Sequence, residues 1–156
     1  MRKWYTGILL LGLSVSTAVQ AQTSYTGSAG LGIEFQEGAT FVGPSAKYFF
    51  TENHAGQLDL GFETGATLLN LLYGYHSEFA GAAGLRWYGG GGLTFIFGSG
   101  FDTLVALRLV PGLDYKIDAV PLAFSFDWRP AIALSSNGGD RFSAGNFFLG
   151  IKYAFD

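Results

Sequence analysis

Polar and apolar residues alternate with a period of two along most of this chain. In the stretch LRLVPGLDYKID (107–118), Arg108, Asp114, Lys116 and Asp118 hold even positions, and apolar residues hold the odd ones. Successive side chains of a β-strand point to opposite faces, so the pattern predicts strands with one charged and one apolar face. Which of these faces lies inside decides the environment of the protein.

Eight alternating segments can be identified, separated by short turn-like stretches. They span residues 25–35, 39–50, 55–66, 67–76, 85–97, 104–118, 121–134 and 142–155. No stretch has the period of a helix, and no linker indicates a second domain. Evenly spaced strands with polar turns predict an all-β antiparallel, up-and-down meander.

The first 21 residues have the organisation of a secretory signal peptide. Arg2 and Lys3 precede a short apolar run (8–15), and Val19 and Ala21 form a small-residue cleavage site. A membrane anchor is the alternative, but the run is shorter than the roughly 20 residues that a spanning helix needs. We therefore expect residues 1–21 to be removed on export, leaving a single domain over residues 22–156.

The composition excludes several classes of site. The chain has no cysteine and only two histidines, so disulfides, thiolate metal sites and a recognisable metal-ligand cluster are not expected. A net charge of −3 argues against nucleic-acid binding. We expect no metal and no cofactor. Charged residues make up 13% of the chain, against about 25% in soluble domains, so much of the surface faces something other than water.

The polar strand faces have the character of a closed interior. They are rich in Gly, Ala and Ser, which the crowded inside of a small barrel requires, and their charges balance at six positive and six negative. Buried charges are tolerated when they are paired. We therefore predict a lumenal charge network of Glu34, Lys47, Asp59, Glu63, Arg86, Arg108, Asp114, Lys116, Asp118, Asp127, Arg129 and Lys152.

The aromatic residues of the apolar faces gather at one set of strand ends. In an up-and-down meander one rim receives Tyr25, Tyr48, Phe50, Tyr73, Tyr75, Trp87, Tyr115, Tyr153 and Phe155. Tyr and Trp favour the membrane–water interface, and strands of this length can cross a bilayer. A soluble β domain with an apolar core is the alternative. The pattern favours an eight-stranded antiparallel up-and-down transmembrane β-barrel.

The stretches LRWYGGGG (85–92), GLDYKID-AVPLAFSFDWRP (112–130) and LGIKYAF (149–155) resemble small Gram-negative outer-membrane β-barrels of the OmpA and OmpX size class. The resemblance implies an outer-membrane location among outer-membrane lipid, with termini, short turns and the aromatic girdle on the periplasmic side. It also implies that the assembly machinery reads the last strand, although Asp156 follows the terminal aromatic Phe155.

An eight-stranded barrel has an interior just wide enough for side chains to fill. We therefore expect a non-enzymatic, monomeric barrel with a filled, charged lumen and a structural role in the envelope, without catalytic residues. A narrow porin-like channel for ions or small solutes is the alternative. A lipid A-modifying enzyme is a third class, suggested by His-Ser-Glu at 76–78, but sequence adjacency does not make a triad, and the topology assigns these residues to a periplasmic turn.

Three prolines and a run of glycines lie inside predicted strands. Pro44, Pro111 and Pro130 each remove a ladder donor, and we expect bulges at these positions. The YGGGG stretch (88–92) lacks the residues of a phosphate-binding loop, so it indicates a bend, a bulge or close packing.

Overall fold

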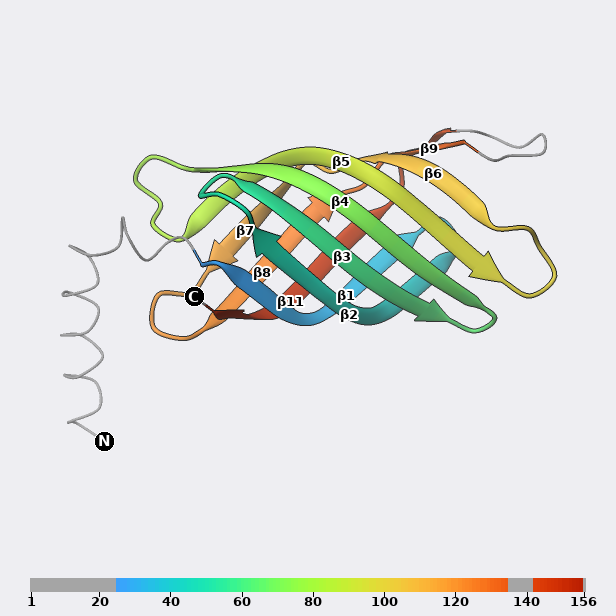
Figure 1. Ribbon diagram of the computed structural model, residues 1–156, viewed down its shortest axis with the longest axis horizontal. Coiled ribbons are helices and arrows are strands. Elements are labelled where there is room, and N and C mark those ends of the chain that lie inside the picture. The colour runs from blue at the N-terminus through green and yellow to red at the C-terminus, as the bar shows by residue number, and fades with distance from the viewer. Residues whose placement is uncertain (1–24, 135–141, 156) are drawn as a thin grey trace.

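The computed structural model describes residues 25–134 and 142–155, and the described chain forms a single antiparallel sheet that closes into a barrel (Figure 1). Its strands are β1 (Gly27–Gln36), β2 (Ala39–Phe49), β3 (His54–Glu63), β4 (Ala66–Glu78), β5 (Leu85–Gly98), β6 (Leu104–Leu109), β7 (Gly112–Lys116), β8 (Leu122–Trp128), β9 (Ala131–Ala133), β10 (Phe142–Ser143) and β11 (Phe147–Phe155). In the described ranges no helix is long and apolar enough to cross a membrane. The predicted signal peptide, residues 1–21, lies outside these ranges.

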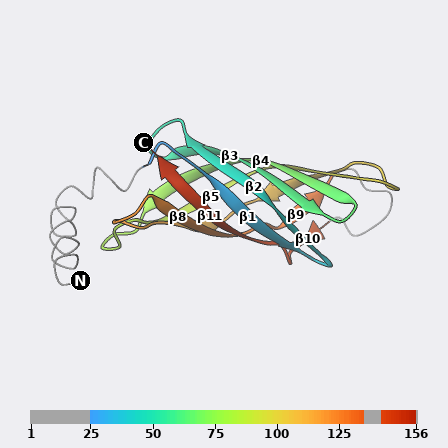
Figure 2. The same ribbon diagram turned by 90° about the horizontal axis from the view of Figure 1, so that it is seen from below.

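The barrel closes because each strand pairs with a neighbour on both sides. β1 pairs with β2 and with β11, and β5 pairs with β4 and with both β6 and β7. β6 with β7, β8 with β9, and β10 with β11 each make one interrupted strand, so the barrel has eight antiparallel strands. Figure 2 shows β11, β1 and β2 side by side. The predicted fold class is confirmed.

Pro111 and Pro130 interrupt two neighbouring strands without changing their register. Pro111 separates β6 from β7, and Pro130 separates β8 from β9. Facing residues of an antiparallel pair normally exchange two hydrogen bonds. Here the Leu109 amide donates to the Pro130 carbonyl at 3.1 Å, and the Trp128 amide donates to the Pro111 carbonyl at 3.0 Å. Each proline therefore costs its rung one bond, and the expected bulge at Pro111 is wrong.

A bulge does occur on the strand that faces Pro130. Trp128 pairs with Phe147, and Ala131 pairs with Ser143. Between these two pairs, one strand has two residues (129 and 130), and the facing strand has three (144–146). The extra residue is a β-bulge.

At Pro44 the β2–β3 ladder has no extra residue. Within the described residues the ladder carries pairs at Val42 and Ser45 but none at Gly43 or Pro44. The missing N–H therefore leaves a local gap in the ladder, and the expected bulge is wrong here too.

The charged face of the sheet lies inside the barrel and the apolar face lies outside. Arg129 and Asp127 are completely buried, whereas Leu31 and Ile151 are 63% and 56% exposed. Such a surface is stable where the barrel exterior contacts an apolar medium rather than water. Phe41 and Phe49 also point inward, which explains why they break the alternation of the second segment.

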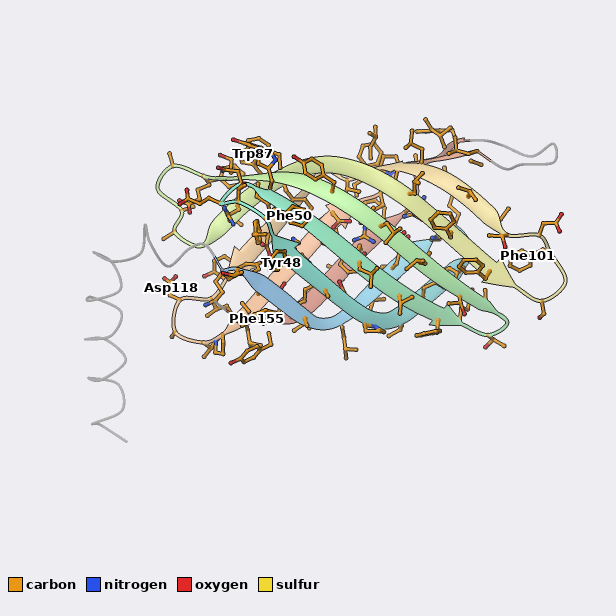
Figure 3. All side chains as sticks on the ribbon, viewed as in Figure 1. Tyr48, Phe50, Trp87, Phe101, Asp118 and Phe155 are labelled. Carbon is orange, nitrogen blue, oxygen red and sulfur yellow. The ribbon has the colours of Figure 1, made fainter. Side chains whose placement is uncertain are left out.

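Eight of the nine predicted girdle residues point outward at the barrel end where β1 begins and β11 ends. They are Tyr48, Phe50, Tyr73, Tyr75, Trp87, Tyr115, Tyr153 and Phe155; Figure 3 shows four of them. Tyr25 is the exception, and its assignment to the girdle is wrong. It precedes β1, is 3% exposed, and its hydroxyl donates to Asp114 inside the barrel at 2.5 Å. Strand alternation does not extend to a residue that lies outside the strand.

Candidate functional site

The candidate site is the charged lumen, formed by alternate residues of every barrel strand. Nine of the predicted network residues are buried there: Glu34, Lys47, Asp59, Arg86, Arg108, Asp114, Asp127, Arg129 and Lys152. Glycines at inward positions give these side chains space. A Cβ at Gly32, for example, would lie 2.4 Å from the Phe148 ring, so this ring occupies the volume that the glycine leaves.

Glu63, Lys116 and Asp118 lie outside the buried network, contrary to the prediction. Glu63 ends β3 and is exposed, and Asp118 is exposed in the turn after β7. Lys116 is half-buried, and its ammonium donates to the carbonyls of Ile117 and Val120 at 2.7 and 2.9 Å. These three residues occupy lumenal positions in the alternating pattern, which is why they were predicted to be buried. They lie at strand ends that reach water, where a charge needs no ionic partner.

Arg129 is the centre of the network. One terminal nitrogen, Nη1, lies 3.0 Å from Glu34 Oε2 and 2.8 Å from Asp59 Oδ2, while Nε lies 2.5 Å from Asp127 Oδ1. One guanidinium thus contacts carboxylates from three strands, β1, β3 and β8. The fixed fork of guanidinium N–H groups suits this arrangement better than an ammonium does.

Glu34 on β1 also joins Arg129 to Arg108, which lies on β6, the strand that pairs with β9. Arg108 Nη1 lies 2.5 Å from Glu34 Oε1, an ion pair by distance that lacks the alignment of a hydrogen bond. The same carboxylate accepts from the side-chain amides of Gln36 at 2.9 Å and Asn70 at 2.7 Å. Both oxygens of Glu34 are therefore satisfied despite burial, which offsets the cost of removing the charge from water.

The other two carboxylates around Arg129 are also held by neutral donors. Asp59 accepts from the Ser45 hydroxyl and from the Gln57 side-chain amide at 2.9 Å. Asp127 accepts from the Tyr88 hydroxyl at 2.5 Å. This part of the lumen contains three carboxylates and two guanidiniums, Arg108 and Arg129.

A second cluster lies nearer the aromatic rim and is mainly cationic. Lys47 lies 3.8 Å from Asp114 Oδ2 and 3.2 Å from His76 Nε2, with its ammonium 4.5 Å from the centre of the Tyr88 ring. Arg86 donates to the Glu52 carbonyl at 2.5 Å. Asp114 is the one carboxylate of this cluster, as far as the described residues extend.

Several cationic N–H groups of this cluster lack a hydrogen-bond acceptor within the described ranges. They are Lys152 Nζ and the Nε and Nη1 of Arg86. The Lys152 ammonium instead lies 5.6 Å from the centre of the Phe148 ring. In the whole lumen, the buried charged residues are five cations and four carboxylates, whereas the sequence predicted six of each.

The lumen is filled by these side chains. Two internal cavities of 10 Å³ each lie inside it, one beside Glu34 and Asp59 and the other beside Lys47 and His76. A cavity of this size holds about one water molecule. Neither offers room for an organic ligand.

His76 does not belong to a catalytic triad in this structure. It lies in β4, which runs to Glu78, so the prediction of a turn at 76–78 is wrong. Its ring is buried, stacks on Tyr88 at 4.6 Å, and its Nε2 faces Lys47. Sequence adjacency of Ser77 and Glu78 therefore creates no nucleophile–base pair here. In the described ranges no group of His, Cys, Asp and Glu could hold a metal ion.

The sequence reasoning did not identify the neutral partners of the network. Asn70 and Thr94 are fully buried, and the Thr94 hydroxyl donates to Asn70 Oδ1 at 2.5 Å. They face each other on β4 and β5. Both residues were visible in the sequence on the polar faces of consecutive strands. Only the register between those two strands would have shown that they face each other.

Comparison with known proteins supports the fold. No protein-family model matches the chain, and no curated protein matches it. Among solved structures it is similar to the crystal structure of the N-terminal β-barrel domain of Pseudomonas aeruginosa OprF, with a TM-score of 0.62 and 19% sequence identity. The match covers 84% of this chain and 98% of that domain. At this identity the likeness concerns the fold alone.

Proposed function

We propose that this chain is an outer-membrane β-barrel protein with a closed, side-chain-filled lumen and a structural, non-enzymatic role in the envelope. The observation that carries the proposal is the combination of an exposed apolar exterior with a packed ionic interior. The cavities beside its two charged clusters measure only 10 Å³ each. An exterior of this kind requires lipid contact, and an interior of this kind resists solute passage.

The proposal includes a route to the membrane. Residues 1–21 direct export and are removed, the assembly machinery inserts the closing strand β11, and the mature domain of residues 22–156 is a monomer among outer-membrane lipid. The similarity to the OprF barrel domain and the aromatic rim at the start of β1 and the end of β11 support this topology, with that rim in the periplasmic leaflet. N-terminal sequencing of the protein from membranes should give Gln22 as the first residue.

Planar-bilayer recording of the purified full-length mature protein tests the closed lumen. We expect no stable single-channel steps, with a known open porin as the positive control. Gel migration before and after boiling confirms in the same preparation that the barrel is folded. Reproducible steps from folded protein would contradict the closed lumen and favour transport.

A narrow channel is the second candidate, because the rim-side lumen has an excess of positive charge. Lys47, Arg86 and Lys152 are buried there with Asp114. A path through this region would select anions, since a field of one sign raises the local concentration of counter-ions. The reversal potential in a salt gradient would identify that selectivity. Lipid A modification, the third class, predicts a changed lipid A mass spectrum when the gene is present; we expect no change.

A further inference from the structure

The outer wall of the barrel has an apolar hollow of 680 Å³ next to the aromatic rim. Its floor consists of small outward residues, Ala29, Ala46, Gly56 and Gly91, on four different strands. A water molecule takes up roughly 30 Å³, so the hollow is far larger than a packing defect between side chains. Elsewhere the outward face carries mainly large apolar residues.

Strand register explains why the hollow has aromatic walls. Gly56 lies between Tyr48 on β2 and Tyr73 on β4, and Tyr73 in turn faces Gly91 on β5. A Cβ at Gly56 would lie 2.8 Å from the Phe50 ring, so this ring covers the glycine and forms one edge of the hollow. Small and aromatic residues thus alternate across four strands, which leaves a groove between rigid rings.

A polar group stands at the rim end of the groove. His54 begins β3 two residues before Gly56, and its Nδ1 hydrogen-bonds the Tyr73 hydroxyl. Its ring stacks on Tyr73 and meets Tyr75 edge-on at 5.3 Å. Outward residues of one strand are two positions apart, so the imidazole and the hollow lie on the same face along β3.

We propose that the hollow binds one phospholipid of the leaflet at the barrel end where β1 begins and β11 ends, with an acyl chain in the hollow and the phosphate group at His54. The proposal rests on the outer-membrane function above. The hollow leads from the membrane interface toward the bilayer centre, so its apolar lining fits a single acyl chain. The imidazole of His54, at the interface, can donate a hydrogen bond to a phosphate oxygen.

The charges at this barrel end identify the headgroup class. Glu52, Glu78 and Asp118 are exposed there, while the ammonium of Lys116 is engaged by two backbone carbonyls. Glu52 is two residues from His54, so a headgroup with both a phosphate and an amine finds partners of both signs. The occupant is therefore a zwitterionic, ethanolamine-type phospholipid rather than an anionic one.

Native mass spectrometry of the folded, detergent-purified barrel tests the proposal, after titration with phosphatidylethanolamine or phosphatidylglycerol. We expect one phosphatidylethanolamine to remain bound and phosphatidylglycerol to bind more weakly. Ala46→Phe places a ring in the hollow. It should lower retention about tenfold, because excluding two methylene groups is worth about that much in affinity.

Val42→Phe is the matched control, since Val42 lies outward on the same strand but outside the hollow. It should keep the lipid, and both variants should still show the heat-dependent gel shift. Equal retention in wild type and Ala46→Phe, or equal binding of both lipids, would overturn the proposal while the barrel function stands. If the wild type instead gave the mass of a dimer, and Ala46→Phe gave only the monomer, the occupant would be a second copy of this chain. Loss of the gel shift in wild type would contradict the barrel function itself.

Discussion

The guanidinium carbon of Arg129 lies 3.8 Å from the centre of the Phe148 ring, while the edge of the same group contacts Glu34, Asp59 and Asp127. Both the face and the edge of the guanidinium are therefore in use. A cation–π contact is strongest where water is excluded, and Arg129 and Phe148 are both buried. This one residue joins the β8–β9 strand to β1, β3 and β11.

Removing this cation should be the most destabilising single change in the lumen. In Arg129→Met a side chain of similar length leaves three buried carboxylates without their common cation. Breaking a buried ion pair in this way costs about 3–5 kcal/mol. Urea unfolding of the barrel in lipid vesicles, followed by tryptophan fluorescence, should show a correspondingly lower free energy of unfolding.

Two further variants give this experiment its controls. Arg129→Lys keeps the charge but loses the fork geometry, and should fall between wild type and Arg129→Met. Lys116→Met removes a half-buried cation outside the network and should cost about 1 kcal/mol or less, since water reaches the ammonium and the carbonyls it contacts. A Met variant at position 129 as stable as Lys116→Met would show that the network contributes little.

The sequence predicted the barrel well because a strand has one dominant rule. Period two assigned nearly every inward and outward side chain correctly, from Arg108 inside to Ile151 outside. The same rule located the strand ends to within a few residues. Both faces are equally regular, so the remaining question was which face lies inside. The small size of the polar-face residues, the balance of their charges and the aromatic residues at one rim together favoured the charged face.

The errors occur where the rule stops applying. Tyr25 folds inward before β1 begins, and Glu63 and Asp118 reach solvent where a strand ends. The bulge at residues 144–146 depends on how two strands shift against each other, which a single segment does not record. The hydrogen bond between Thr94 and Asn70 likewise requires the register of β4 and β5.

The Tyr88 hydroxyl gives a milder test of the network. In the wild type the Tyr88 hydroxyl donates to Asp127 at 2.5 Å. Tyr88→Phe removes this donor, while the ring still stacks on His76. Loss of one hydrogen bond to a charged acceptor should cost about 1.5–3 kcal/mol in the free energy of unfolding. Tyr115→Phe, which changes an outward rim residue, should cost less. Equal losses in the two variants would argue against a role for the buried hydroxyl.

The two tryptophans of the described chain report which face contacts lipid. Trp87 and Trp128 are 41% and 40% exposed on the outer face. Lipids with brominated acyl chains should therefore quench both, and aqueous iodide should quench neither strongly. Trp87→Phe and Trp128→Phe isolate each signal; Trp87, at the rim, should respond best to bromines near the headgroup. Strong quenching by iodide, with no effect of bromolipid, would mean that the outer face contacts water.

Gly89 and Gly90 provide a matched pair within the glycine run of β5. A Cβ at Gly90 would lie 1.8 Å from the Tyr73 carbonyl oxygen and 2.6 Å from the Cα of Gly74, whereas a Cβ at Gly89 meets no atom within 4 Å. Gly90→Ala must therefore push β4 away from β5. Because backbone atoms cannot yield as a flexible side chain does, we expect a loss of about 1–3 kcal/mol or more. Gly89→Ala should be neutral or stabilise by up to about 1 kcal/mol through a less flexible unfolded chain. The folded fraction after refolding into vesicles, read from the heat-dependent gel shift, compares the two. Equal folded fractions would show that the close approach of β4 and β5 is not what requires a glycine at position 90.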